Sequence, residues 1–269
     1  MENNAHGLQK CPEPPWSIYV CYEKGRKRVE WFNKYKKEGI EKVTTPLLRG
    51  YEDVFFIYYP VASKFIGILE ELLANEQVQG IRMCFGVDAF SDPPKRGKLD
   101  IVMAPGRLNS ERKLQDIRAL YTRASTLEKL DYASAKKMTE YYKTNIVPKL
   151  QNTLSEDDIA KEEFETENVY FKREYLELFI RETKCQVEKV KIGVKGIKIL
   201  FVSYHDIPDV TNSGIPLTKR LTIQFVYTDK NGTSINLEKT DLRYENIPEN
   251  FGNFDTGDPT PPFDNYSDI

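Results

Sequence analysis

One short stretch occurs twice in this chain. Residues 80–86 read GIRMCFG, and residues 196–202 read GIKILFV. In both, apolar residues recur at every second position after the glycine, a period typical of a β-strand with one buried face. An aromatic run and an amphipathic segment precede each copy, and a second alternating apolar run follows it. The sequence therefore predicts two related units in one chain.

The separation between corresponding residues grows steadily along the chain. It is 107 positions from Trp31 to Met138, 114 from Phe65 to Phe179, 116 from Gly80 to Gly196, and 122 from Leu99 to Leu221. A duplication followed by insertions in loops produces such a drift while it keeps the elements in the same order. We interpret the pattern as an internal repeat.

The predicted fold class is α+β, with two similar modules that each contain a helix, a strand, a helix and a β-hairpin. Their sheets are expected to be mostly antiparallel, because short connections join the strands of each hairpin. The predicted organisation is an extended N-terminal arm (1–20), a first module (21–106), a helical connector (107–130), a second module (131–250) and an acidic, proline-rich tail (251–269).

Hydrophobic periodicity gives the elements of each module. The expected helices are 22–37 and 63–75 in the first module, and 135–143 and 175–180 in the second. The expected strands are 54–60, 80–86 and 99–103, then 169–171, 197–201 and 221–225. Residues 110–130 are charged, with apolar residues at helical spacing, which predicts the connector helix. Asn231-Gly232 predicts a hairpin turn after the last of these strands.

Composition narrows the class of protein. The chain has 269 residues, of which 40% are hydrophobic and 12% aromatic, enough to build a core. Basic residues number 39 and acidic residues 41, so the basic surplus typical of nucleic-acid-binding proteins is missing. The most apolar window, 54–73, is interrupted by Pro60 and Lys64, which argues against a membrane span. The partner is expected to be a protein rather than a nucleic acid or a membrane.

The start of the sequence lacks the pattern of a secretory signal. Together with four cysteines that are expected to be reduced thiols, this predicts a cytoplasmic protein. His6, Cys11 and Cys21 do not have the spacing of a zinc site. Glycine-rich phosphate loops and G-x-S-x-G elbows are also missing. We therefore expect neither a metal nor a cofactor.

With both copies aligned, the chain resembles an uncharacterised family of bacterial proteins. That family carries an Ala-x-x-Trp-x-x-x-Tyr helix, approximated here by Ala135, Met138 and Tyr142. Its Gly-[Ile/Val]-Arg strand is matched by residues 80–86, and its Gly-x-x-Cys-Pro-Pro ending is similar to 255–262, where the cysteine is missing. The resemblance covers most of the chain but implies no activity.

Two groups of residues are candidates for a site. Tyr204, His205 and Asp206 are consecutive, and they unite a phenol, an imidazole and a carboxylate. The simplest interpretation is a solvated junction between a strand and a loop, because neighbours along a strand point to opposite faces. Arg82 and Lys198 occupy equivalent positions in the two copies, on the face opposite the inward apolar set. Such cations are most often exposed to solvent, but two of them related by a repeat could form an anion site.

Two functions follow from these observations. The leading hypothesis is a non-enzymatic protein-interaction or assembly module, supported by the missing catalytic motifs and by 16 tyrosines, whose rings suit protein interfaces. The alternative is a small-molecule-binding protein or hydrolase with a site between the modules, which leaves enzymatic activity open. The binding residues for that alternative are Arg82, Asp88, Lys198, Tyr204, His205 and Asp206.

Overall fold

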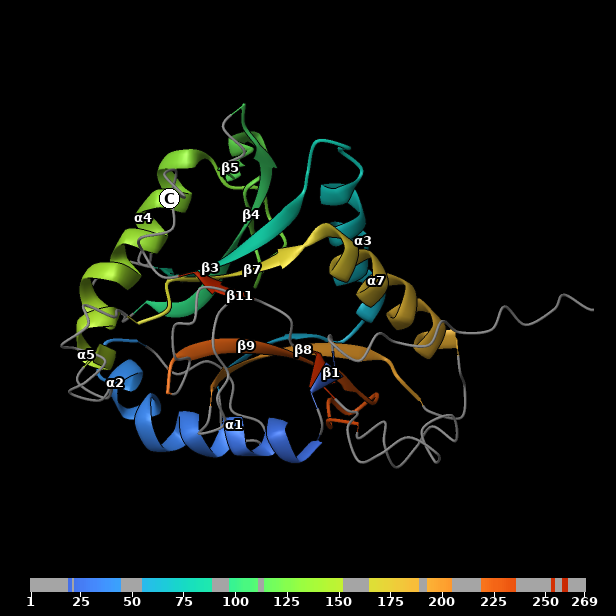
Figure 1. The fold of residues 1–269 in the computed structure, drawn as a ribbon. Coiled ribbons are helices and arrows are strands. Elements are labelled where there is room, and N and C mark those ends of the chain that lie inside the picture. The colour runs from blue at the N-terminus through green and yellow to red at the C-terminus, as the bar shows by residue number, and fades with distance from the viewer. Residues whose placement is uncertain are drawn as a thin grey trace, which may run out of the picture.

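Two antiparallel sheets face each other across one core, with helices on both outer faces and along one side (Figure 1). The computed structural model describes residues 19–20, 22–44, 55–88, 97–110, 114–151, 165–188, 193–204, 219–235, 253–254 and 258–260. Helices combined with antiparallel sheets confirm the predicted α+β class.

The strands form sheet A and sheet B. The order in sheet A is β1 (Tyr19–Val20), β10 (Asn253–Phe254), β9 (Leu221–Thr228), β8 (Gly196–Ser203) and β2 (Phe56–Tyr59). The order in sheet B is β11 (Asp258–Thr260), β7 (Asn168–Lys172), β3 (Gly80–Asp88), β4 (Lys98–Leu108) and β5 (Leu114–Asp116), and β6 (Thr122–Arg123) also pairs with β4. The described parts of the predicted arm and tail thus add short strands to both sheets.

Helices enclose the two sheets. They are α1 (Tyr22–Tyr35), α2 (Lys37–Glu41), α3 (Ala62–Leu73), the 3-10 helix η2 (Arg118–Leu120), α4 (Tyr132–Tyr141), the π-helix η3 (Tyr142–Ile146), α5 (Val147–Gln151) and α7 (Arg173–Glu188). Helix α1 covers the outer face of sheet A and α4 that of sheet B, while α3 and α7 pack against each other (Figure 1). The apolar stripe predicted for 63–75 is buried on α3, which confirms that helix.

The two predicted modules exchange strands. Strand β2 belongs to the first module but pairs with β8 of the second, with Tyr59 opposite Ile197. Strand β7 belongs to the second module but pairs with β3 of the first, with Phe171 opposite Ile81. Each aromatic strand therefore completes the sheet of the other module. The module boundaries remain predictions, but the sheets do not follow them.

The two hairpins also pair in matching register. Val87 lies opposite Leu99 in the β3–β4 hairpin, and Ser203 lies opposite Leu221 in the β8–β9 hairpin. These pairs reproduce the separations of 116 and 122 positions found in the sequence. The match supports the repeat, while the duplication that would explain it remains a prediction.

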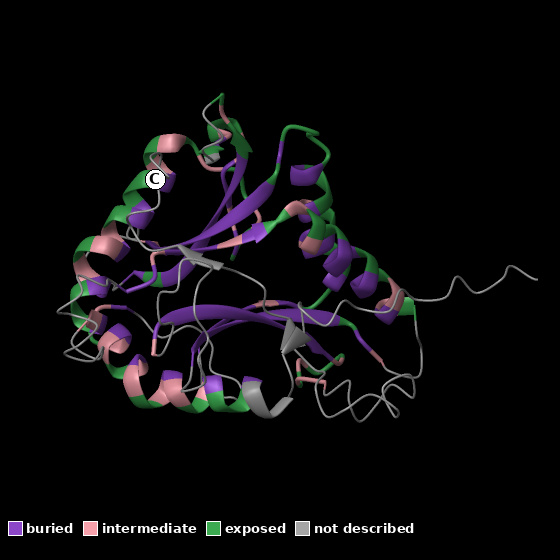
Figure 2. Cartoon of the chain, viewed as in Figure 1, coloured by how far each residue is buried: buried purple, intermediate pink, exposed green. Residues whose placement is uncertain are grey.

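Corresponding aromatic residues meet in the core. The ring centroids of Phe85 and Phe201 are 6.0 Å apart, and those of Phe65 and Phe179 are 6.4 Å apart. The inward side chains of the two repeated stretches are buried, as the strands in Figure 2 show. They are Ile81, Met83, Phe85, Ile197, Ile199 and Phe201. Packing of both stretches into one core supplies a large apolar contribution to stability.

A buried ion pair also joins the modules. The Lys36 ammonium group donates to Glu165, and neither side chain is exposed. Burial lowers the pKa of Lys36, and the Glu165 carboxylate opposes that shift. The other carboxylate oxygen of Glu165 accepts the backbone N–H of Leu221 at 2.6 Å, at the start of β9. This carboxylate thus links the helical segment around Lys36 to sheet A.

The helical connector predicted at 107–130 was wrong. Strand β4 continues past Pro105 and Gly106 to Leu108, and the rest forms β5, η2 and β6. The carbonyl of Pro105 accepts the backbone N–H of Ile117 at 2.7 Å. Pairing along β4 satisfies the backbone here, and that tertiary contact outweighs a helical pattern in a charged segment.

The cysteines differ in part from the expectation of reduced thiols. Cys84 is free and buried. Cys185 on α7 is disulfide-bonded, and its partner lies outside the described residues. Disulfides persist mainly in oxidising compartments, so this bond counts against a cytoplasmic location. Within the described ranges, none of the helices is long and apolar enough to cross a membrane.

We expect Gly80→Ala to destabilise the fold by about 1–3 kcal/mol through overpacking. A Cβ atom at Gly80 would lie 2.5 Å from the carbonyl oxygen of Phe171 on the exchanged strand β7. Gly67→Ala on α3 is the matched control, because a Cβ atom there meets nothing within 4 Å, and alanine stabilises a helix by about 1 kcal/mol. Urea unfolding of both variants tests this, and equal stabilities would contradict it.

Strand exchange predicts that neither half folds alone. Cutting between Ser125 and Thr126, both exposed in a turn, gives fragments 1–125 and 126–269. Each fragment lacks the aromatic strand that completes its sheet, so each should be unfolded alone, and an equimolar mixture should regain the native fold. Amide NMR spectra of the separate and mixed fragments measure this. A dispersed spectrum from either fragment alone would contradict the prediction.

Candidate functional site

Arg82 and Lys198 are buried, on outer faces of different sheets. The two residues are 1% and 3% exposed; α4 packs on β3, the strand of Arg82, and α1 packs on β8, the strand of Lys198. The expectation that they face solvent was therefore wrong. The repeated apolar stretches fill the core between the two sheets, so the two cations do not converge on a shared anion site.

Arg82 reaches across β4 to β5. Its Nε donates to Oδ1 of Asp116 at 3.1 Å, its Nη2 donates to Oδ2, and the Tyr121 hydroxyl donates to Oδ2 at 3.0 Å. Burial alone would lower the pKa of Arg82, but the charge of the Asp116 carboxylate and its hydrogen bonds raise it above its ordinary value. Burial also raises the pKa of the Cys84 thiol to about 12, so the thiol is uncharged at neutral pH. We call Arg82, Asp116 and Tyr121 the β5 clamp.

The other predicted site residues have partners of their own. The Lys198 ammonium lies 4.7 Å from the Phe56 ring centroid, and Asp88 accepts Nη2 of Arg123 at 2.9 Å. Tyr204 is buried beneath the Arg28 guanidinium, which lies 4.6 Å from the centre of its ring. His205 and Asp206 lie outside the described residues.

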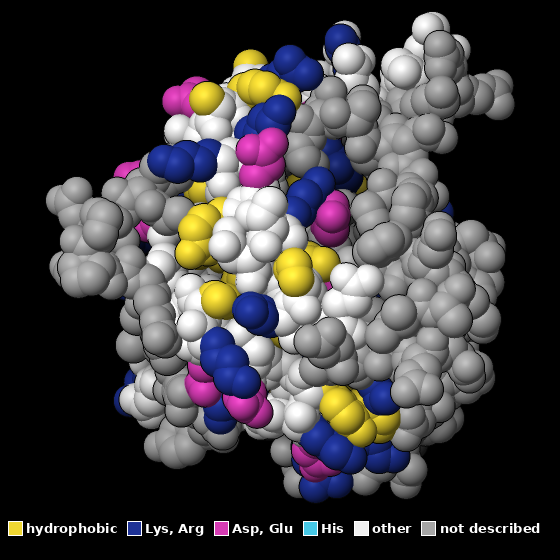
Figure 3. Space-filling model, turned by 90° about the vertical axis from the view of Figure 1, so that its left-hand side faces the viewer, with side chains coloured by type: hydrophobic (Ala, Val, Ile, Leu, Met, Phe, Trp, Pro, Cys, Tyr) yellow, Lys and Arg dark blue, Asp and Glu magenta, His cyan; other side chains and the backbone are white. Residues whose placement is uncertain are grey.

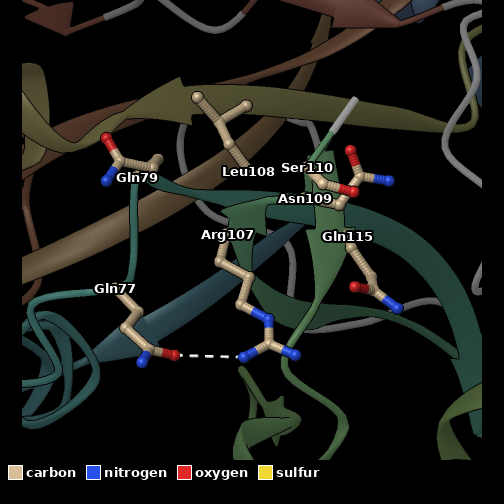
Figure 4. A pocket seen from close by; sticks show the side chains of 7 residues that line it. All are labelled: Gln77, Gln79, Arg107, Leu108, Asn109, Ser110 and Gln115. Atoms are coloured by element: carbon tan, nitrogen blue, oxygen red, sulfur yellow. Dashed lines mark hydrogen bonds between the residues drawn. The ribbon is translucent and has the colours of Figure 1, made fainter. Parts of the chain in front are cut away.

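An open, polar surface pocket of about 550 Å³ lies at the edge of sheet B, and all of its lining residues except the half-buried Asn109 are exposed (Figure 4). Its lining comes from the turn between α3 and β3, the end of β4, the residues that follow β4, and β5. The lining residues are Gln77, Gln79, Arg107, Leu108, Asn109, Ser110 and Gln115. We call this pocket the amide hollow, because four of its side chains are carboxamides.

Strand pairing shapes the amide hollow. Arg107 of β4 lies directly opposite Gln115 of β5, so both side chains project from the same face of the sheet. Nη1 of Arg107 donates to Oε1 of Gln77 at 3.1 Å, which joins the sheet to the turn after α3 (Figure 4). The backbone N–H of Gln79 donates to the carbonyl of Gly106 at 2.8 Å.

The β5 clamp fixes the position of β5, which supplies one wall of the hollow. Asp116 follows Gln115 directly in β5, and its buried carboxylate is bound to Arg82 of β3. The three-residue strand β5 is thereby attached to the centre of the sheet as well as to its neighbour β4. Arg82, proposed from the sequence as a ligand-binding group, acts here through the position of β5.

The position equivalent to Arg107 in the second half of the chain belongs to a tight turn. The register of the hairpins aligns Arg107 with Asp229. Oδ1 of Asp229 accepts the backbone N–H groups of Asn231 at 2.8 Å and Thr233 at 2.9 Å, and Gly232 has a φ of +80°. This confirms the turn predicted at Asn231-Gly232. The chain therefore turns tightly after β9, at the position where the chain after β4 lines the hollow.

Sequence reasoning missed Arg107 and Gln115, because both fell in the segment assigned to a helix. One signal was available. Alignment of the two repeats at a separation of 122 places arginine against aspartate at this position. Because the two copies carry opposite charges at this position, the residue in one copy is a candidate for a function that the other copy lacks.

The chemistry of the amide hollow favours binding over catalysis. Its carboxamides and hydroxyl donate and accept hydrogen bonds without titrating near neutral pH, and Arg107 remains charged. The seven residues include no nucleophile paired with a general base, which acyl or phosphoryl transfer to protein requires. Within the described ranges, no cluster of three or more His, Cys, Asp or Glu side chains could hold a metal.

Charge elsewhere on the surface is mixed. On the face shown in Figure 3, basic and acidic side chains of the described residues lie next to one another rather than in separate fields. Ion pairs such as Lys136–Glu140 and Lys143–Glu167 on α4 and η3 show the same mixing. On this face, the described residues therefore form no continuous basic surface of the kind that a nucleic-acid backbone requires.

No family model, curated protein or solved structure matches this chain. The resemblance to a bacterial family therefore remains a prediction, and the function has to be argued from the geometry.

We expect Asp116→Ala to destabilise the protein by about 3–5 kcal/mol, because it leaves the Arg82 charge buried without its partner. Replacement of both, as Arg82→Met with Asp116→Leu, should recover most of that loss. Glu70→Ala is the control, since its pair with Lys184 is half-exposed and worth under about 1 kcal/mol. Urea unfolding measures all three. A loss for Asp116→Ala no larger than the control would contradict the clamp.

Proposed function

We propose that this protein is a non-enzymatic interaction module that binds an extended segment of a partner protein in the amide hollow. The observation that carries the proposal is the lining itself. Three parts of the chain bring together four carboxamides, a hydroxyl, an arginine and an exposed leucine, with no acid–base pair among them. Its volume of about 550 Å³ lies within the range of ligand pockets, roughly 300–1,000 Å³.

An extended segment suits this position because β5 is a terminal strand. In the part of the chain that is described, β5 pairs with β4 alone. A peptide that adds to a terminal strand gains main-chain hydrogen bonds, and neighbouring pockets read its side chains. Carboxamide side chains match the N–H and C=O groups of such a backbone. Leu108, whose side chain is 52% exposed, offers an apolar contact at the rim.

The alternative, a small-molecule binder or hydrolase between the modules, has less support. Its cations Arg82 and Lys198 are buried in different sheets, with the apolar core between the sheets. The balanced charge of the chain favours a protein partner over a nucleic acid. Cysteines expected to be reduced predicted the cytoplasm, whereas the disulfide that Cys185 forms favours an oxidising compartment.

Photocrosslinking in the native host cells tests the proposal. A photoreactive phenylalanine at position 108 should capture a discrete partner, because that side chain lies at the rim of the hollow. The same residue at position 61 is the matched control, since Val61 is a comparably exposed apolar side chain, 45%, outside the hollow. Equal products from both positions, or none from position 108, would contradict the proposal.

A further inference from the structure

Arg107 is the one charged side chain among the seven that line the amide hollow. Arg107 is exposed, and within the described part of the chain it forms no ion pair, whereas the buried Arg82 and the half-buried Arg123 do. A cation that faces a cavity without an acidic neighbour attracts a negative group from outside. The hollow is therefore electrostatically suited to an anion.

The orientation of the Arg107 guanidinium is specific. Its one hydrogen bond to a described residue uses Nη1, which donates to Oε1 of Gln77. The N–H groups of Nε and Nη2 meet no acceptor among the described residues. Together they form one side of the guanidinium, and that side can bind both oxygens of a carboxylate at once. The bond to Gln77 occupies the opposite side of the guanidinium and leaves this side open to a ligand.

Gln115 completes the arrangement. It is the cross-strand neighbour of Arg107, and its side chain projects beside the guanidinium on the side away from Gln77 (Figure 4). Its carboxamide can donate one further N–H to an anion bound by Arg107. In the second half of the chain, Asp229 holds the equivalent position and binds its own turn, so this arrangement belongs to the first half alone.

We infer that the amide hollow recognises a carboxylate, from an aspartate or glutamate side chain of the bound segment, through the free side of the Arg107 guanidinium. This inference rests on the proposed function, which supplies the extended segment. A single arginine with neutral carboxamides fits a singly charged, planar group. Phosphoryl groups, which carry more charge, are usually bound by clusters of arginines.

Three random octapeptide libraries, blocked at both ends, test the inference on the full-length protein. They differ in one central residue, which is Glu, Gln or phosphoserine. We expect the Glu library to bind about threefold more strongly than the Gln library, because Arg107 is exposed and an exposed ion pair contributes less than about 1 kcal/mol. Arg107→Gln should abolish that preference. Lys230→Gln should leave it unchanged, because Lys230 is an exposed cation on the equivalent turn of the second half.

The outcomes distinguish the carboxylate inference from the proposed binding of an extended segment. Equal binding of the Glu and Gln libraries overturns the carboxylate inference but leaves peptide binding intact, and stronger binding of the phosphoserine library overturns it in favour of phosphate. If none of the libraries binds, the proposed function fails. Titration with acetate, with acetamide as control, then decides the inference by itself. Acetate that shifts the NMR signal of the Arg107 Nε–H supports a carboxylate site, and no shift overturns it.

Discussion

The exchange of two aromatic strands is the constraint on which the rest of this structure depends. Strand β2 completes the sheet of the second module, and β7 completes that of the first. Each exchange brings an aromatic strand over a glycine, Gly80 or Gly196, where a Cβ atom would lie 2.5 Å from a carbonyl oxygen of that strand. The apolar faces of both sheets pack into a single core, so neither module has a complete hydrophobic core of its own.

Buried polar contacts connect this core to the surface. On the outer face of sheet B, the β5 clamp ties a terminal strand to β3, and the next residue, Gln115, lines the amide hollow. Breaking such a buried pair leaves a charge without compensation, so its geometry is strongly constrained. The hollow is thus a surface feature whose shape is determined by contacts beneath it, as a preorganised binding site requires.

Most of the regular structure could be predicted from residue periodicity. The alternation at Ile81, Met83 and Phe85 and the helical stripe on α3 are local patterns with a direct structural meaning. The segment after Gly106 could not be predicted, because its charged residues carry a helical pattern while β4 offers a neighbouring strand to pair with. The burial of Arg82 and Lys198 could not be predicted either, because the sequence of a strand does not show whether a helix covers its second face.

The sequence by itself determined the α+β class and the two repeated stretches, because periodicity acts between near neighbours. Tertiary structure alone decided which sheet each aromatic strand joins, since either hairpin presents a suitable edge. It also decided that Arg107, Gln77 and Gln115 meet. These residues lie up to 38 positions apart, and only the pairing of β4 with β5 beside the turn after α3 brings them to one cavity.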